Sequence, residues 1–136
     1  AEAGEKLKEA GAKRVLPLKV SGPFHSKMLV GAGEKLGKVL DTVEIHTPEI
    51  PYIANVTADY VTDAADVKPL LMKQVSSSVR WEQSVRAMLA DGVDTFIEIG
   101  PGKTLAGFMK KIDRTVKVLN IEKLEDVDKV VEEVRC

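Results

Sequence analysis

The spacing of apolar residues along the chain alternates between two patterns, one typical of helices and one of strands. Apolar side chains recur every three or four residues in six segments, which predicts helices over residues 2–10, 29–41, 67–75, 81–91, 105–112 and 124–134. Short apolar runs between these segments predict strands over residues 14–20, 52–56, 95–99 and 116–121. Strands that alternate with helices pair in parallel through right-handed crossovers, so the pattern predicts an α/β fold.

Glycine and proline set the expected boundaries of these elements. Gly11 and Gly92 each follow a predicted helix, where a left-handed residue commonly ends the last turn. Pro17 lacks a backbone donor and therefore places the first strand near a sheet edge. Pro69 is expected in the first turn of its helix, where proline is tolerated. The polar stretch over residues 57–66 is expected to lead into this helix.

Length, composition and charge exclude several classes of protein. The 136 residues fit one domain, and 44% hydrophobic residues are enough for a core. Lys and Arg are spread along a chain of net charge −1, which argues against binding nucleic acid through its phosphates. No apolar run approaches the ~18 residues of a membrane-spanning helix.

The two ends of the chain add expectations about its origin. The charged, helical start lacks the features of a signal peptide, and it also lacks Met, so we expect a piece of a longer protein. The single cysteine, Cys136, excludes an internal disulfide framework and fits a reducing cytoplasm. We expect it to be inert.

His25 is the candidate catalytic residue. It lies in residues 20–28, where a predicted strand gives way to a helix, and ligands of α/β proteins bind at such strand ends. Imidazole titrates near neutral pH and can take a proton from a serine nucleophile. His46 has no comparable neighbours, and we expect it at the surface. Two distant histidines and one cysteine provide no ligand set for a metal.

A glycine-rich turn, residues 100–104, invites a nucleotide-binding interpretation. A phosphate-binding loop requires glycine five positions before Gly102, and that position holds Ile97. Pro101 also removes a backbone donor that would cradle phosphate. The turn is therefore interpreted as a structural connection between strand and helix.

Three segments, residues 20–28, 74–81 and 97–105, together resemble the C-terminal part of the malonyl-CoA:acyl carrier protein transacylase family. The resemblance implies that residues 21–136 are the C-terminal part of an α/β-hydrolase-like core with mostly parallel strands. Residues 1–20 would be the last helix and strand of a small ferredoxin-like subdomain. The family's serine motif, Gly-His-Ser-x-Gly, occurs nowhere in the chain, so the resemblance implies part of an enzyme.

The resemblance also implies residue roles. His25 would be the catalytic base, and the main-chain carbonyl of Gln74 would orient its ring in place of an aspartate. Phe24 would favour malonyl over branched acyl groups by its size, although a packed core aromatic is an equal alternative. Asn55 would hydrogen-bond near the acyl pocket, unless it only satisfies its own turn.

The implied reaction is transfer of malonyl from CoA to the phosphopantetheine thiol of acyl carrier protein, in type II fatty acid synthesis in the cytoplasm. No cofactor beyond these substrates is expected. The implied partners are the carrier protein, the CoA thioester and the missing N-terminal part of the enzyme. An acidic carrier protein would be attracted to positive charge around one helix, supplied by Lys103, Lys110, Lys111 and Arg114. Alternatively, these side chains only form a solvated helix face.

Two other interpretations remain open. One is a non-catalytic α/β module that docks a carrier protein or another partner. The other is a free-standing hydrolase that uses Ser21 or Ser26, neither of which lies in a Gly-x-Ser-x-Gly motif. Without its nucleophile, the 136-residue chain is expected to transfer no malonyl by itself.

Overall fold

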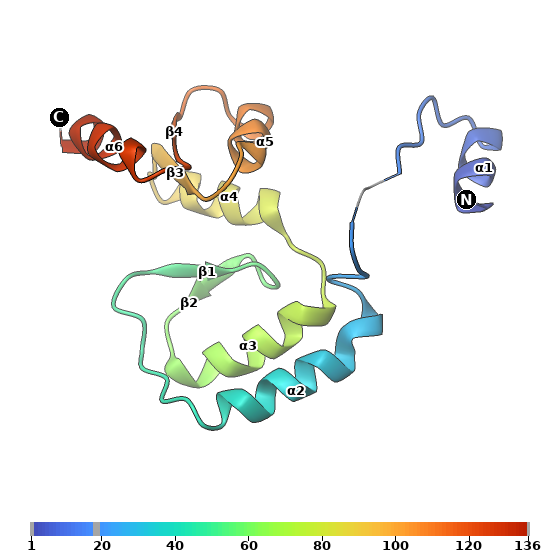
Figure 1. Ribbon diagram of the computed structural model, residues 1–136, viewed down its shortest axis with the longest axis horizontal. Helices are drawn as coiled ribbons and strands as arrows, with labels where there is room; N and C mark the ends of the chain where they lie inside the picture. Colours follow the sequence, from blue (N-terminus) through green and yellow to red (C-terminus); the bar gives the residue numbers. More distant parts are fainter. Residues whose placement is uncertain (1, 18–19, 136) are drawn as a thin grey trace.

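The computed structural model describes residues 2–17 and 20–135 (Figure 1), so Cys136 and residues 18–19 of the predicted first strand lie outside it. Its fold is mixed α/β, and all six predicted helices are present. In chain order the elements are α1 (Glu2–Glu9), the 3-10 helix η1 (Lys27–Leu29), α2 (Val30–Leu40), β1 (Tyr52–Ala54), β2 (Asp59–Val61), α3 (Ala64–Ser76), α4 (Trp81–Ala90), β3 (Thr95–Ile99), α5 (Thr104–Ile112), β4 (Lys117–Ile121) and α6 (Glu125–Arg135).

The elements gather in two groups, and α1 stands apart from both (Figure 1). One group holds the C-terminal α/β unit, in which β3 and β4 pair in parallel from Thr95 opposite Lys117 to Ile99 opposite Ile121. Helix α5 connects these two strands. This unit confirms the predicted strand–helix–strand pattern. The other group contains β1, β2, α2 and α3.

The second group contains a strand that the sequence pattern missed. β1 pairs with β2 in antiparallel register, with Tyr52 opposite Val61. The polar stretch over residues 57–66 therefore contains a strand that was not predicted, and one of the two described sheets is antiparallel. β2 has only three residues, too few for a visible alternation, and its turn uses Ala58 at a φ of 61° instead of a glycine.

The first predicted strand, over residues 14–20, is absent from its described part, residues 14–17 and 20. A strand is stable only where a neighbouring strand accepts its backbone hydrogen bonds. None of the described strands pairs with this segment, since β1 pairs only with β2 and β3 only with β4.

Helix α3 begins earlier than its apolar pattern indicated. The Asp63 carboxylate accepts a 2.8 Å hydrogen bond from the Ala65 N–H and caps the helix. Pro69 is consequently the sixth residue of α3, inside the helix, and the expectation that it lies in the first turn is wrong. Proline there leaves one carbonyl of the preceding turn without its helical donor.

Helices α2 and α3 pack against each other unusually closely. A Cβ atom added at Gly33 would lie 2.7 Å from the main-chain oxygen of Met72, and one at Gly37 would lie 2.6 Å from the Met72 side chain. Glycine at position 33 is therefore needed for this approach of the two helices, whereas at position 37 the flexible Met72 side chain could move. The close packing fixes the position of α3, which carries Gln74.

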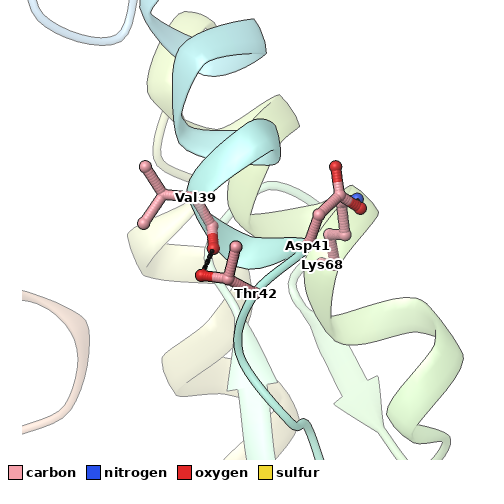
Figure 2. Close-up of polar contacts among 4 residues, drawn as sticks. All are labelled: Val39, Asp41, Thr42 and Lys68. Carbon is pink, nitrogen blue, oxygen red and sulfur yellow. Dashed lines mark hydrogen bonds and ion pairs between the residues drawn. The ribbon is translucent and has the colours of Figure 1, made fainter.

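The C-terminal end of α2 is also held in place (Figure 2). The Thr42 hydroxyl donates a 2.8 Å hydrogen bond to the carbonyl of Val39. Beside it, Lys68 of α3 forms an ion pair with Asp41. A packed pair of glycines and an ion pair thus join the two helices along their length.

The described core is small, and much apolar surface is exposed. Buried apolar residues come from both groups of elements and are Ala54, Val61, Val85, Met109 and Val130. In contrast, Ile99 of β3 is 77% exposed, and Ile97 on the same face of the strand is also exposed. Within residues 2–17 and 20–135, no helix combines the length and the apolar character that crossing a bilayer requires.

Candidate active site

His25 has an unusual backbone conformation. Its φ is 56°, and among the described residues other than glycine only Ala58 shares a positive φ. A residue with a side chain is strained in this left-handed region, and such strain gathers at functional sites because the surrounding structure must maintain it. The apolar pattern of the chain carried no sign of this conformation.

The His25 ring contacts the end of a helix. Its Nδ1 lies 3.0 Å from the main-chain oxygen of Gln74, a residue 49 positions later in the chain. Because a carbonyl oxygen only accepts, Nδ1 is the donor, and in a neutral ring the lone pair then lies on Nε2. The structure therefore brings together the two residues expected to form the catalytic pair, in the tautomer that a general base at Nε2 needs.

Gln74 lies in the last turn of α3, which explains why its carbonyl is available. The last four carbonyls of an α-helix have no partner within the helix, and the helix dipole places about −0.5 of an elementary charge at this end. A cationic imidazole is stabilised by such a charge. The end of α3 therefore presents a partial negative charge to the His25 ring, weaker than that of the carboxylate that orients the histidine in serine proteases.

The Gln74 side chain, to which we assigned no role, closes this helix end. Its Nε2 donates a 3.2 Å hydrogen bond to the Ser77 carbonyl, while the Ser77 N–H lies 3.4 Å from the Gln74 carbonyl. Gln74 Nε2 is also 3.4 Å from His25 Nδ1. Two N–H groups cannot bond to each other, so the shorter contact, with the carbonyl oxygen, determines the proton position.

Phe24 and Asn55 take no part in the hydrogen bond between His25 and Gln74. Phe24 precedes His25 and is 64% exposed, so it is not packed in a core formed by the described residues. Asn55 is exposed, and its main-chain oxygen accepts a 2.8 Å hydrogen bond from the Arg80 N–H at the start of α4. Arg80 also donates to the Thr57 carbonyl, which ties the turn after β1 to α4. The roles of Phe24 and Asn55 toward substrate stay predictions.

Ser26 is not hydrogen-bonded to the histidine. Its hydroxyl donates a 2.7 Å hydrogen bond to the Pro23 carbonyl. The hydrolase interpretation requires a serine hydroxyl whose proton His25 can take, and this bond gives it no support at Ser26. His46 is exposed, as expected, and lies 3.8 Å from the Glu44 carboxylate.

The strand-to-helix turn after β3 is occupied by a carboxylate of the chain itself. Glu98 accepts hydrogen bonds from the N–H groups of Leu105 and Ala106, at 3.0 and 2.8 Å. The first turn of α5 thus already has an anionic partner where a phosphate would bind. This capping role of Glu98 was not foreseen, and it supports a structural role for the Gly-Pro-Gly turn.

The chain is similar in sequence to bacterial malonyl-transfer enzymes, although no protein-family model matches it. It is 47% identical over 130 residues to the malonyl CoA-acyl carrier protein transacylase of Bacillus subtilis and 45% identical over 123 residues to that of Staphylococcus aureus. These alignments cover 96% and 90% of the chain. The chain spans only 41% and 40% of the length of these curated relatives.

Solved structures agree with this similarity. A malonyl CoA-acyl carrier protein transacylase from Clostridium perfringens superposes with a TM-score of 0.87 at 40% identity, covering 98% of this chain and 42% of that one. A type II PKS acyl-carrier protein in complex with its malonyl-transacylase gives 0.87 at 34% identity, covering 96% and 42%. The chain is therefore homologous to malonyl-CoA:acyl carrier protein transacylases and corresponds to a C-terminal portion of such a protein.

Proposed function

We propose that the chain is the histidine-bearing part of an enzyme that transfers malonyl from coenzyme A to acyl carrier protein. The observation that carries this proposal is the 3.0 Å contact between His25 Nδ1 and the Gln74 carbonyl. With the proton on Nδ1, a neutral ring offers the lone pair of Nε2, which is what a base for a serine nucleophile requires.

In the proposed reaction, His25 moves one proton in each half. Nε2 takes the proton of a serine hydroxyl as the serine oxygen bonds to the malonyl carbonyl carbon. It then gives that proton to the coenzyme A sulfur as the carbon–sulfur bond breaks. In the second half, Nε2 takes the proton of the phosphopantetheine thiol, the thiolate attacks the malonyl ester, and the serine oxygen recovers the proton. The Gln74 carbonyl stabilises the imidazolium formed in each half.

The nucleophile of this reaction lies outside the 136 residues. The sequence contains no Gly-x-Ser-x-Gly motif, and it spans 41% of the Bacillus subtilis relative. We therefore propose that the chain by itself transfers no malonyl. In this proposal residues 21–136 belong to an α/β-hydrolase-like core and residues 1–20 end a ferredoxin-like subdomain, a division supported by the separation of α1 from the other elements (Figure 1).

Two partners follow from this proposal. The rest of the enzyme would cover exposed apolar residues such as Ile97, Ile99 and Phe108, which a soluble surface rarely gathers. An acidic acyl carrier protein would be attracted to the cationic residues Lys103, Lys110, Lys111 and Arg114 of α5 and its flanks. The reaction needs no cofactor beyond its substrates, and we place it in type II fatty acid synthesis in the cytoplasm.

A chimera tests the proposal. The chain would replace the matching 130 residues of the Bacillus subtilis relative, and malonyl transfer to acyl carrier protein would be compared with the chain alone. We expect transfer by the chimera and none by the chain alone. Transfer by the chain alone, or a folded chimera that is inactive, would contradict the proposal. If His25→Ala abolished transfer but kept carrier binding, a pure docking role would be excluded.

A further inference from the structure

Ser26 uses its side chain in an unexpected way. It occupies the N-cap position of η1 with an extended backbone, φ −125° and ψ 161°. Serine at this position ordinarily accepts a hydrogen bond from an N–H group of the first helical turn. The Ser26 side chain makes no such bond, and its hydroxyl donates backwards to Pro23 at 2.7 Å.

This hydrogen bond closes a turn that has His25 inside it. Pro23 precedes the histidine by two residues and Ser26 follows it by one. The strained φ of 56° at His25 therefore lies between the two ends of the bond. A short hydrogen bond across a strained residue favours the conformation in which the strain exists, because an extended His25 would separate the two ends.

The turn is also attached to the helix that presents Gln74. The Leu29 N–H donates a 3.0 Å hydrogen bond to the Ser26 carbonyl, which begins η1, and η1 packs against α3. The backbone of His25 is thus positioned by Ser26 on one side, while its ring is held by Gln74 on the other. His25 Nδ1 reaches the Gln74 carbonyl only when the backbone turn and the ring orientation are both correct.

We propose that Ser26 is a positioning residue for His25, whose hydroxyl maintains the left-handed turn that brings Nδ1 to the Gln74 carbonyl. Its importance for catalysis rests on the proposed function, but its effect on the histidine does not. Ser26 is therefore neither a nucleophile nor a cap of η1. A hydroxyl is needed here, so threonine should substitute for it and alanine should not.

Nitrogen-15 spectra of the full chain test the proposal without any enzymatic assay. The chain has two histidines, and His46, which is exposed and lies 3.8 Å from the Glu44 carboxylate, serves as the reference for a ring without a contact to a main-chain carbonyl. We expect wild type and Ser26→Thr to show His25 with a protonated Nδ1 and a bare Nε2. Ser26→Ala should shift His25 toward the mixed signals of His46, with the Nδ1-protonated population falling about fivefold to tenfold relative to the alternative, the factor that one hydrogen bond represents.

A matched control separates this effect from loss of folding. Ser78 is exposed and its hydroxyl has no hydrogen bond among the described residues, so Ser78→Ala should leave the His25 signals unchanged. Backbone amide spectra would confirm that α3 is intact in every variant. If Ser26→Ala is folded and its His25 signals equal those of wild type, the proposal is wrong.

Kinetics of the chimera complete the test. Ser26→Ala should lower kcat by about fivefold to tenfold with little change in KM, and Ser26→Thr should restore it. An equal loss in both variants would overturn the need for a hydroxyl. If instead His25→Ala left transfer intact, the proposed function would fail, whereas the spectra would still decide whether Ser26 positions the ring.

Discussion

Replacing Gly33 with alanine tests whether close helix packing supports the site. The added Cβ would lie 2.7 Å from the Met72 main-chain oxygen, about 0.7 Å short of the 3.4 Å at which ordinary contact begins. That oxygen belongs to the backbone of α3, so the helices must separate. Gln74 lies two residues after Met72, and the separation should lengthen its 3.0 Å contact with His25.

The expected magnitude follows from two opposing terms. Overpacking of this kind costs about 1–3 kcal/mol, whereas replacing a helical glycine with alanine gains up to about 1 kcal/mol. With the full helical gain subtracted, Gly33→Ala should therefore lower the free energy of unfolding by up to about 2 kcal/mol. Gly31 lies on the same helix with no atom within 4 Å of an added Cβ, so Gly31→Ala should be neutral or stabilising. Gly37→Ala should fall between them, because it meets only the flexible Met72 side chain.

Urea unfolding monitored by circular dichroism measures this order directly. The same three variants, examined by histidine nitrogen-15 spectra, show whether the His25 tautomer follows the movement of α3. We expect only Gly33→Ala to disturb it clearly. Equal stability of Gly33→Ala and Gly31→Ala would refute the claim that α2 and α3 need glycine at their contact.

Three further predictions concern other contacts of the chain. Glu98→Gln should lower the free energy of unfolding by about 0.5–1 kcal/mol in urea titrations, because the carboxylate charge complements the N-terminus of α5; an unchanged midpoint would contradict this. The N–H groups of Lys123 and Glu122 hold the pKa of Asp126 below its ordinary value of 3.8, so its stabilisation is present above about pH 4 and is lost as the pH falls through the lowered pKa. In thermal melts between about pH 5 and pH 2, the melting temperature of Asp126→Asn should therefore fall less steeply with falling pH than that of wild type. An equally steep fall in both proteins would argue against this role of Asp126. Phe24→Ala should change the free energy of unfolding by less than about 0.5 kcal/mol, since the ring is exposed, while raising transfer of methylmalonyl relative to malonyl by about tenfold in the chimera; an unchanged ratio would remove Phe24 from the pocket.

The sequence predicted those parts of the fold that depend on local pattern. The stripe of Leu105, Phe108, Met109 and Ile112 predicted α5 closely, because apolar residues three and four positions apart share one face of a helix. The parallel pairing of β3 with β4 followed from the helix between them. The pairing of His25 with Gln74 was implied by the family resemblance, and no periodicity could have indicated a contact across 49 residues.

The features that were missed depend on contacts between distant segments or on single backbone angles. β2 exists because β1 is beside it, whereas residues 14–17 stay irregular without a neighbouring strand. The positive φ of His25 follows from a turn closed by Ser26, and serine is common in many other settings. Glu98 is a strand residue in sequence, and only the return of the chain as α5 reveals it as a helix cap. In each case the partner lies outside the window that a local pattern covers.

The most direct test of the proposed histidine is the rate of malonyl transfer by the chimera carrying His25→Ala, with His46→Ala as the matched control. General base catalysis contributes a factor of about 100 to 10,000, so kcat should fall by at least about 100-fold when the base is lost. His46→Ala should transfer at the rate of the parent chimera. Turnover by folded His25→Ala within a few-fold of the parent would mean that this imidazole is not the base, and the account built on it would be wrong.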